Sequence, residues 1–254
     1  MALSAVLAFF VGAALGSFVT VIAHRVPRGE GFVTGRSRCP SCGAQVEARD
    51  NIPIVSWLLL RGRCRHCGET ISARYPLTEA AMAILWLATV LIVGTDDAGE
   101  LVLGLAFVTV LVTITLTDLE LRIIPNAIVA AGALAGIVIV LAFDLGDLGQ
   151  RALAVGIGAG ALLLVVLAYP RGMGMGDVKL VAMMGIYLGR SLAPALLVGF
   201  AAGSIVGVAM ILREGASARK AAVPFGPFLA LGGVIGLWWG DEMVDWYLDT
   251  FTGS

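Results

Sequence analysis

The sequence predicts an all-α polytopic membrane protein with about eight transmembrane helices and one small cytoplasmic loop domain. Of its 254 residues, 59% are hydrophobic and 14% are charged, whereas an ordinary soluble domain has about 25% charged residues. The mean hydropathy is +0.94. The apolar residues also gather in runs that approach or exceed the roughly 20 residues a helix needs to cross a bilayer. This composition excludes a disordered chain and a typical soluble enzyme, and the net charge of −1 argues against a partner nucleic acid.

The expected spans follow one another with short connections. Seven apolar runs lie at about 3–23, 77–94, 101–117, 125–143, 151–169, 192–212 and 224–240, and a shorter run lies at 178–190. The stretch from Leu180 to Leu212 carries one charged residue, Arg190, and is too long for a single crossing. We therefore expect two helices there, joined by a turn at Gly189-Arg190-Ser191.

The distribution of basic residues predicts the orientation of these spans. With eight helices, the inner segments hold 15 of the 17 Lys and Arg residues, and only Arg151 and Arg190 lie outside. Cytoplasmic loops carry such an excess, so both termini are expected outside and the hydrophilic loop in the cytoplasm. A seven-helix alternative would move the cluster Arg213–Lys220 outside. The expected organisation is a first helix at 1–23, a cytoplasmic loop at 24–76 and a seven-helix membrane core at 77–254.

All four cysteines lie in the hydrophilic loop, in the pairs Cys39-Pro-Ser-Cys42 and Cys64-Arg-His-Cys67. Two Cys-x-x-Cys pairs separated by 21 residues suit a structural zinc ion, whose closed site takes four thiolates. Zinc would also supply folding energy to a loop too short for a large core. The alternatives are free thiols or a redox pair. His66 is expected to be solvated rather than a ligand.

Two acidic residues border the hydrocarbon region. Asp118 ends the run 101–117, and Asp177 begins the run 178–190 within Gly174-Met175-Gly176-Asp177-Val178-Lys179. The expected topology places both at the cytoplasmic end of the membrane, and intramembrane acids are functional candidates by default. Two close carboxyl groups share a proton, which suits aspartyl protease chemistry, and Gly174 and Gly176 would let the backbone approach a substrate. The alternative is that each Asp only caps or starts a helix at the interface. Glu120 would face away from Asp118, and Glu79 is expected in the first turn of its helix.

The chain resembles the type IV prepilin peptidases, which are polytopic aspartic proteases of the Gly-x-Gly-Asp type. The resemblance covers nearly the whole chain. It is carried, in order, by Gly16-Ser17-Phe18, Cys39–Cys42, Asn51–Trp57, Arg61–Cys67, Ile71–Glu79, Asp118 with Ile124-Pro125-Asn126, Gly174–Lys179 and Pro224–Phe228.

The resemblance implies that Asp118 and Asp177 are the catalytic pair and that Gly174, Gly176 and Lys179 bind substrate or support the loop. It implies cleavage of leader peptides from type IV prepilins and type II secretion pseudopilins, at the cytoplasmic face of the bacterial inner membrane. In this family the cysteine loop accompanies N-methylation of the new N-terminus, which uses S-adenosylmethionine. The sequence itself shows no binding residues for that cofactor.

Two other classes of function are open from the residues alone. A proton-coupled transporter would use Asp118 and Asp177 as a relay, with the zinc loop recruiting partners. A non-enzymatic scaffold would use the zinc loop in the same way. Transporters often have acids at the midplane and internal repeats, whereas here both acids are expected at one face and no repeat is evident. The scaffold would leave the paired acids without a role.

Overall fold

The structure is a computed structural model that describes residues 2–31, 37–143, 148–170, 173–214 and 223–251. It divides into two compact units, Met1–Asp97 and Ala98–Ser254. Helices make up almost all of the regular structure, and the β pairing among the described residues consists of two isolated bridges. Of the basic residues expected inside, Arg36, Arg171, Arg219 and Lys220 lie outside the described residues. The expectation of an all-α membrane protein with a cysteine-bearing loop is confirmed.

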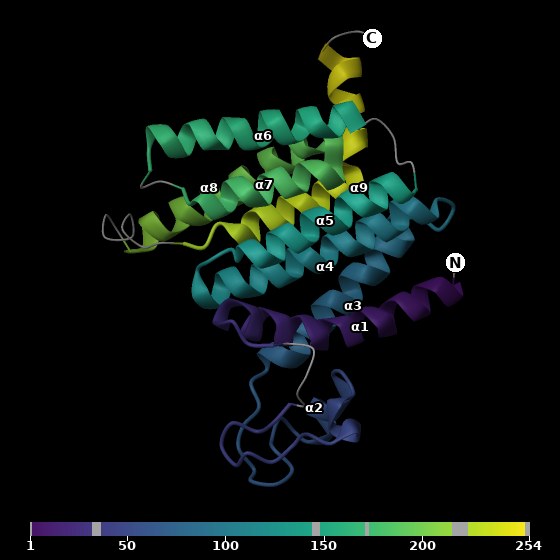
Figure 1. The fold of residues 1–254 in the computed structure, drawn as a ribbon, viewed down its shortest axis with the longest axis vertical. Helices are drawn as coiled ribbons and strands as arrows, with labels where there is room; N and C mark the ends of the chain where they lie inside the picture. Colours follow the sequence, from purple (N-terminus) through teal and green to yellow (C-terminus); the bar gives the residue numbers. More distant parts are fainter. Residues whose placement is uncertain (1, 32–36, 144–147, 171–172, 215–222, 252–254) are drawn as a thin grey trace. The chain divides into compact units, whose positions relative to one another are not determined.

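The first unit pairs two long helices and carries the cysteine loop between them (Figure 1). Its elements are α1 (Ala2–Arg25), the 3-10 turns η1 (Val26–Arg28) and η2 (Ala48–Asn51), the short α2 (Val55–Leu59) and α3 (Arg74–Val93). Helices α1 and α3 pack against each other.

Glycines on α1 allow it to approach α3 closely. A Cβ atom at Gly12 would lie 2.9 Å from the Trp86 Cβ, and one at Gly16 would lie 2.6 Å from the Glu79 Cα. Such small residues are typical of helix interfaces in membranes, where close packing replaces the hydrophobic effect as the driving force.

The second unit is a bundle of six long helices among the described residues, labelled in Figure 1. They are α4 (Ala98–Leu121), α5 (Asn126–Ala142), α6 (Leu148–Ala168), α7 (Met175–Leu188), α8 (Leu192–Glu214) and α9 (Gly226–Phe251), with the 3-10 turn η3 (Gly189–Ser191) between α7 and α8.

Helix α7 is the centre of this unit. It contacts α4, α5, α6 and α9, and Leu180, Met183 and Met184 are almost fully buried. Its neighbours approach through glycines: a Cβ atom at Gly185 would lie 2.9 Å from the Val155 backbone nitrogen on α6. An apolar helix that is buried over most of its surface lies in the core of its unit.

The C-terminal end of α7 is held by two arginines. The Arg151 guanidinium of α6 donates to the carbonyls of Ile186 and Tyr187, at 2.7 and 2.8 Å. The Arg190 guanidinium of η3 pairs with Asp241 and Asp245 of α9, at 2.8 and 2.7 Å. These are the two arginines that the sequence analysis places outside.

Among the described residues, each of the eight expected spans overlaps one long helix, α9 extends eleven residues past its span, and η3 lies at the expected turn. By length and composition, five segments of the described chain can cross a membrane: Ala2–Arg28, Arg74–Val93, Ala98–Leu121, Leu148–Ala168 and Met175–Arg213. The last contains both α7 and α8 and is 39 residues long, nearly twice the length that one crossing needs. Helix α5 is a shorter apolar helix. The number of crossings and their direction stay predictions.

Candidate active site and four-cysteine cluster

One aromatic stack places the two candidate acids at the same level. Phe107 of α4 and Tyr187 of α7 stack with ring centroids 4.7 Å apart. Asp118 lies eleven residues after Phe107 and Asp177 ten residues before Tyr187, so each acid is about 15–17 Å along its helix from the stack. Because the C-terminal end of α4 and the N-terminal end of α7 both face the same cavity, both distances run in the same direction.

Asp118 and Asp177 line a single cavity of about 400 Å³. Gly174 and Gly176 also line it, as do Asn126 at the start of α5 and the segment Val223–Phe225 that precedes α9. The acids themselves are largely withdrawn from solvent, at 5% and 8% exposure. The structure thus brings together residues from three parts of the sequence around two buried carboxyl groups.

Each acid accepts a backbone hydrogen bond. The Gly226 N–H donates to Asp118 Oδ2 at 2.8 Å, and the Gly174 N–H donates to Asp177 Oδ2 at 3.2 Å. Asp177 is the third residue of α7, and its own N–H donates to the Gly174 carbonyl at 3.1 Å. The alternative of a helix-initiating Asp therefore describes Asp177 correctly, yet the same residue lines the cavity. For Asp118 it applies in another form, because the carboxyl accepts the N–H at the start of a different helix, α9, and it too lines the cavity.

Lys179 lies beside the cavity rather than in its lining. Its Nζ donates to the Oδ1 of Asn126 at 2.9 Å, which links α7 to the first residue of α5. Arg122 lines the cavity one turn after Asp118, and its φ of 55° ends α4 in the left-handed region. Non-glycine residues adopt this region at an energetic cost, and such residues cluster at functional sites.

The four cysteines form one cluster in the first unit. All four Sγ atoms lie within 4.8 Å of one another, and the Sγ atoms of Cys39 and Cys67 are 3.7 Å apart. Tetrahedral zinc with bonds of about 2.3 Å to sulfur separates its ligands by about 3.8 Å. The donor set and its spacing therefore fit a tetrahedral metal ion. His66 is exposed and outside the cluster.

Two matching turns build the cluster. In the first, the Cys39 N–H donates to the Ala44 carbonyl and the Gly43 N–H to the Cys39 carbonyl. In the second, the Cys64 N–H donates to the Glu69 carbonyl and the Gly68 N–H to the Cys64 carbonyl. Gly43 and Gly68 have φ values of 70° and 72°, a conformation that favours glycine. This structural repeat, 25 residues apart, extends beyond the paired Cys-x-x-Cys motif to the whole turn.

The turns favour the thiolate form of the first cysteine of each pair. Backbone N–H groups of Cys42 and Ser41 lower the pKa of Cys39 to about 7, and those of Cys67 and His66 lower the pKa of Cys64. The Glu69 N–H lowers the pKa of Cys67, but desolvation and the neighbouring sulfurs outweigh it and raise that pKa to about 12. Four thiolates this close repel one another, so the full set requires a cation.

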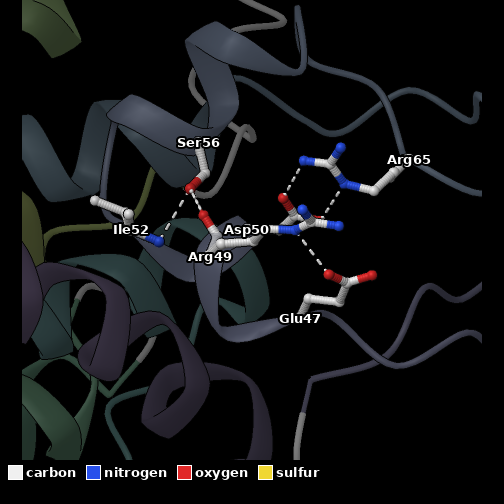
Figure 2. Close-up of polar contacts among 6 residues, drawn as sticks. All are labelled: Glu47, Arg49, Asp50, Ile52, Ser56 and Arg65. Atoms are coloured by element: carbon white, nitrogen blue, oxygen red, sulfur yellow. Dashed lines mark hydrogen bonds and ion pairs between the residues drawn. The ribbon is translucent and has the colours of Figure 1, made fainter.

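An ion-pair network holds the rest of the loop together (Figure 2). The Arg65 guanidinium donates through two nitrogens to both oxygens of Asp50, at 2.8 and 2.6 Å, in the fork seen in Figure 2. This hydrogen bonding lowers the pKa of Asp50. The Ser56 hydroxyl donates to the Arg49 carbonyl at 2.8 Å and accepts from the Ile52 N–H at 3.0 Å. Together these contacts join η2, α2 and the second cysteine turn.

Glu79 fastens the loop to α3. Its Oε2 accepts a hydrogen bond of 2.6 Å from the Ile54 N–H, and the residue is 7% exposed. Because α3 begins at Arg74, Glu79 is the sixth residue of the helix, and the expectation of a first-turn acid is wrong. Ile54 has a φ of 63°, an outlier for a β-branched residue.

Comparison with known proteins shows which family this chain belongs to. Residues 10–93 match the Bacterial Peptidase A24 N-terminal domain, and residues 105–212 match the Type IV leader peptidase family. A prepilin leader peptidase/N-methyltransferase of Aeromonas hydrophila is 34% identical over a 277-residue alignment, which covers 96% of this chain and 94% of the relative. The chain belongs to the type IV leader peptidase family.

Other members of the type IV leader peptidase family give the same result. A prepilin leader peptidase/N-methyltransferase of Bacillus subtilis (strain 168) is 32% identical over 96% of this chain and 98% of the relative. One of Myxococcus xanthus (strain DK1622) is 40% identical over 84% of this chain and 65% of the relative. No solved structure matches the chain. The resemblance drawn from the motifs is confirmed, and the comparisons give no support to a transporter.

Sequence reasoning did not assign a site role to several residues of this family member. Gly226, Asn126 and Phe225 stand in motifs that carry the family resemblance, but composition and spacing gave them no chemistry. Gly226 acts through its backbone N–H, and the residue type gives no indication of such a role. The signal in the sequence is Pro224-Phe225-Gly226-Pro227, where two prolines bracket the start of a helix.

Proposed function

We propose that this chain is a membrane aspartic endopeptidase that removes leader peptides from type IV prepilins and type II secretion pseudopilins. The observation that carries the proposal is the shared cavity of Asp118 and Asp177, in which each carboxyl is held by one backbone N–H. Membership of the type IV leader peptidase family supplies the class of substrate. We assign the protein to the bacterial inner membrane, with the cavity and the large loop on the cytoplasmic side and both termini outside.

The proposed chemistry divides the work between the two acids. One carboxylate removes a proton from water, and the resulting hydroxide adds to the scissile carbonyl carbon. The other, protonated carboxyl donates a hydrogen bond to the carbonyl oxygen. Collapse of the tetrahedral intermediate breaks the C–N bond, and the leaving amine takes a proton from the first acid. Because one oxygen of each Asp accepts a backbone N–H, the second oxygen of each remains for water and substrate.

The glycines and Lys179 are proposed to shape the cavity around the substrate backbone. A Cβ atom at Gly176 would lie 3.0 Å from the Ile124 Cβ, so a larger residue would press into the cavity wall. Gly174 provides the N–H that holds Asp177. Lys179 supports the site indirectly, because it fixes the side chain of Asn126.

Substitution of each acid tests the peptidase assignment. Asp118→Asn and Asp177→Asn, co-expressed with a prepilin, are expected to abolish the gel shift that marks leader loss while the proteins still insert in the membrane. Glu120→Gln is the matched control, because Glu120 is an exposed acid on the same helix as Asp118. Complete processing by either Asp variant would refute the catalytic pair.

The second proposed activity is N-methylation of the newly exposed N-terminal residue, with S-adenosylmethionine as methyl donor. The relatives named prepilin leader peptidase/N-methyltransferase cover nearly the whole chain, cysteine loop included. We propose that Cys39, Cys42, Cys64 and Cys67 hold a structural zinc ion, which stabilises the loop. Mass spectrometry of the mature substrate should show one added methyl group at its N-terminus. An unmethylated product in the presence of the methyl donor would limit the protein to peptidase activity.

A further inference from the structure

Helix α9 begins directly against Asp118. The N–H of Gly226, the first residue of α9, donates a buried hydrogen bond to Asp118 Oδ2 at 2.8 Å. This contact joins residues 108 positions apart in the sequence. It is the contact by which the C-terminal helix of the chain reaches the candidate catalytic pair.

A side chain at this position would press on the Asp118 carboxyl. A Cβ atom on residue 226 would lie 2.7 Å from Asp118 Oδ2, 3.2 Å from its Cγ and 3.3 Å from its Cβ. Gly226 is not among the glycines with positive φ, so the requirement is one of space and not of backbone conformation. Any side chain here would displace the Asp118 carboxyl from its present place.

The residues around Gly226 leave its N–H as the donor for Asp118. Pro227 has no N–H, and the N–H groups of Phe228 and Leu229 both donate to the Phe225 carbonyl, at 3.1 and 3.2 Å. The N–H groups of the first helical turn have no acceptor inside the helix. The Gly226 N–H is such a group, and it donates to the Asp118 carboxyl. A negative charge at this end of a helix is also favoured by the helix dipole.

The segment before Gly226 is fixed to α8. The ring of Phe225 lies 5.4 Å from that of Phe200 and 6.1 Å from that of Phe228, centroid to centroid. A Cβ atom at Gly203 would lie 2.7 Å from the Phe225 Cε2, so the ring lies against the backbone of α8. Pro224 and Phe225 also line the cavity. The donor to Asp118 is thus held by a packed aromatic anchor.

We propose that Gly226 is a positioning residue of the peptidase and that Pro224–Gly226 forms a third segment of its active site, beside the ends of α4 and α7. The Gly226 N–H holds one oxygen of Asp118 in place, so that the other oxygen stays aligned with the attacking water or the scissile carbonyl. This inference rests on the proposed catalytic role of Asp118.

The test compares two alanine substitutions on α9. Gly226→Ala presses on Asp118, whereas in Gly236→Ala the new Cβ would lie 2.6 Å from the Ala195 Cβ, an equally tight contact ten residues from the site. Cleavage of a purified prepilin by the full-length enzyme gives kcat and KM, and thermal unfolding gives stability. Gly226→Ala should lower kcat about 100-fold, as small misplacements of reacting groups do, with KM within about 2-fold of wild type. Gly236→Ala should lose stability but keep its kcat below its unfolding temperature.

Three results would overturn the inference. These are a wild-type kcat in Gly226→Ala, a loss of kcat in both variants in proportion to their loss of stability, and a change of KM alone. Asp118→Asn separates the two levels: full cleavage by that variant refutes the catalytic pair together with this inference. An inactive Asp118→Asn with a fully active Gly226→Ala refutes this inference alone.

A second measurement does not depend on the folding of Gly226→Ala. Hydrogen exchange of a peptide covering residues 223–228 reports on the Gly226 N–H in the Asp118 variants. Exchange should stay slow in the wild type and in Asp118→Asn, whose amide oxygen still accepts the bond, and become faster in Asp118→Ala. Equal exchange in all three proteins would mean that Asp118 and Gly226 do not form the proposed contact.

Discussion

Phe107 of α4 and Tyr187 of α7 stack with an interplanar angle of 20°. These are the two helices that carry the candidate acids near their cavity-facing ends. The Tyr187 hydroxyl also donates to the Gly132 carbonyl of α5 at 2.7 Å. The ring lies against Gly136, where a Cβ atom would be 2.7 Å from the Tyr187 Cε2. One buried side chain thus fixes α7 against both α4 and α5, and through α7 it sets the level of Asp177 relative to Asp118.

Tyr187→Phe and Tyr187→Ala should separate the hydrogen bond from the stack. The Phe variant loses one buried hydrogen bond, about 1 kcal/mol, and should keep its cleavage activity with a thermal midpoint about 2–4 °C lower. The Ala variant removes the stacked ring, which costs about 3–5 kcal/mol, and should also lose activity because α7 is no longer held in register. Thermal unfolding and prepilin cleavage measure both effects. Equal activity in the two variants would show that the stack does not position the acids.

The helices of this fold were predictable from the sequence, but their packing was not. The apolar runs predict the eight long helices of the described chain to within a few residues, except that α9 continues to Phe251, eleven residues past the predicted run. The turn Gly189-Arg190-Ser191 between two apolar runs predicts η3. The runs cannot predict which helices contact one another, because the sequence does not distinguish a leucine that faces lipid from a leucine in the core. Helix α7 is buried over most of its surface, whereas α6 exposes Leu153, Ile157 and Leu164, yet both are similarly apolar in sequence.

Gly16→Val should destabilise the first unit, since its side chain would have to enter the space of the Glu79 backbone on α3. Overpacking of this kind costs about 1–3 kcal/mol. Gly156→Val on α6 is the matched control, because a Cβ atom there meets nothing within 4 Å. Thermal unfolding of the two variants in one detergent should show a lower midpoint for Gly16→Val alone. A similar loss in both would point to the cost of valine in a helix rather than to the α1–α3 contact.

Removal of the metal should unfold the cysteine loop while the helices persist. The loop has few buried apolar residues, and structural zinc supplies much of the folding free energy of such small modules. A chelator, or Cys64→Ser, should lower the zinc content measured by mass spectrometry and expose the segment 37–73 to protease. Ser41→Ala, which keeps all four sulfurs, should retain zinc and protease resistance. Zinc-free protein with a protease-resistant loop would refute a structural metal.

The two arginines at the C-terminal end of α7 should differ in their contribution to stability. Arg190 makes exposed ion pairs with Asp241 and Asp245, which contribute about 0.2–1 kcal/mol each. Arg151 donates to two main-chain carbonyls in a half-buried position, and hydrogen bonds from charged groups contribute about 1.5–3 kcal/mol. Arg151→Gln should therefore lower the thermal midpoint more than Arg190→Gln. The reverse order would mean that the ion pairs, not the carbonyl contacts, hold this end.

The site was predictable where chemistry resides in side chains and unpredictable where it resides in the backbone. Asp118, Asp177 and the cysteines are residue types with their own reactivity, so spacing and topology single them out. The partners of the two acids are the N–H groups of Gly226 and Gly174, and every residue type except proline has such a group. Glu79 was visible as an acid, but its role depends on where α3 begins, and helix boundaries are the least reliable part of a sequence-based prediction.

Glu79 should hold the loop through the Ile54 N–H rather than through its charge. Glu79→Gln keeps a side-chain oxygen that accepts this bond, whereas Glu79→Ala leaves the N–H without its partner, at a cost of about 1–3 kcal/mol. Hydrogen exchange of a peptide that includes Ile54 should be slow in the wild type and in the Gln variant and faster in the Ala variant. The strained backbone of Ile54 should relax once its N–H is released, because such a conformation persists only while its surroundings hold it. Fast exchange in Glu79→Gln would show instead that the full carboxylate is required.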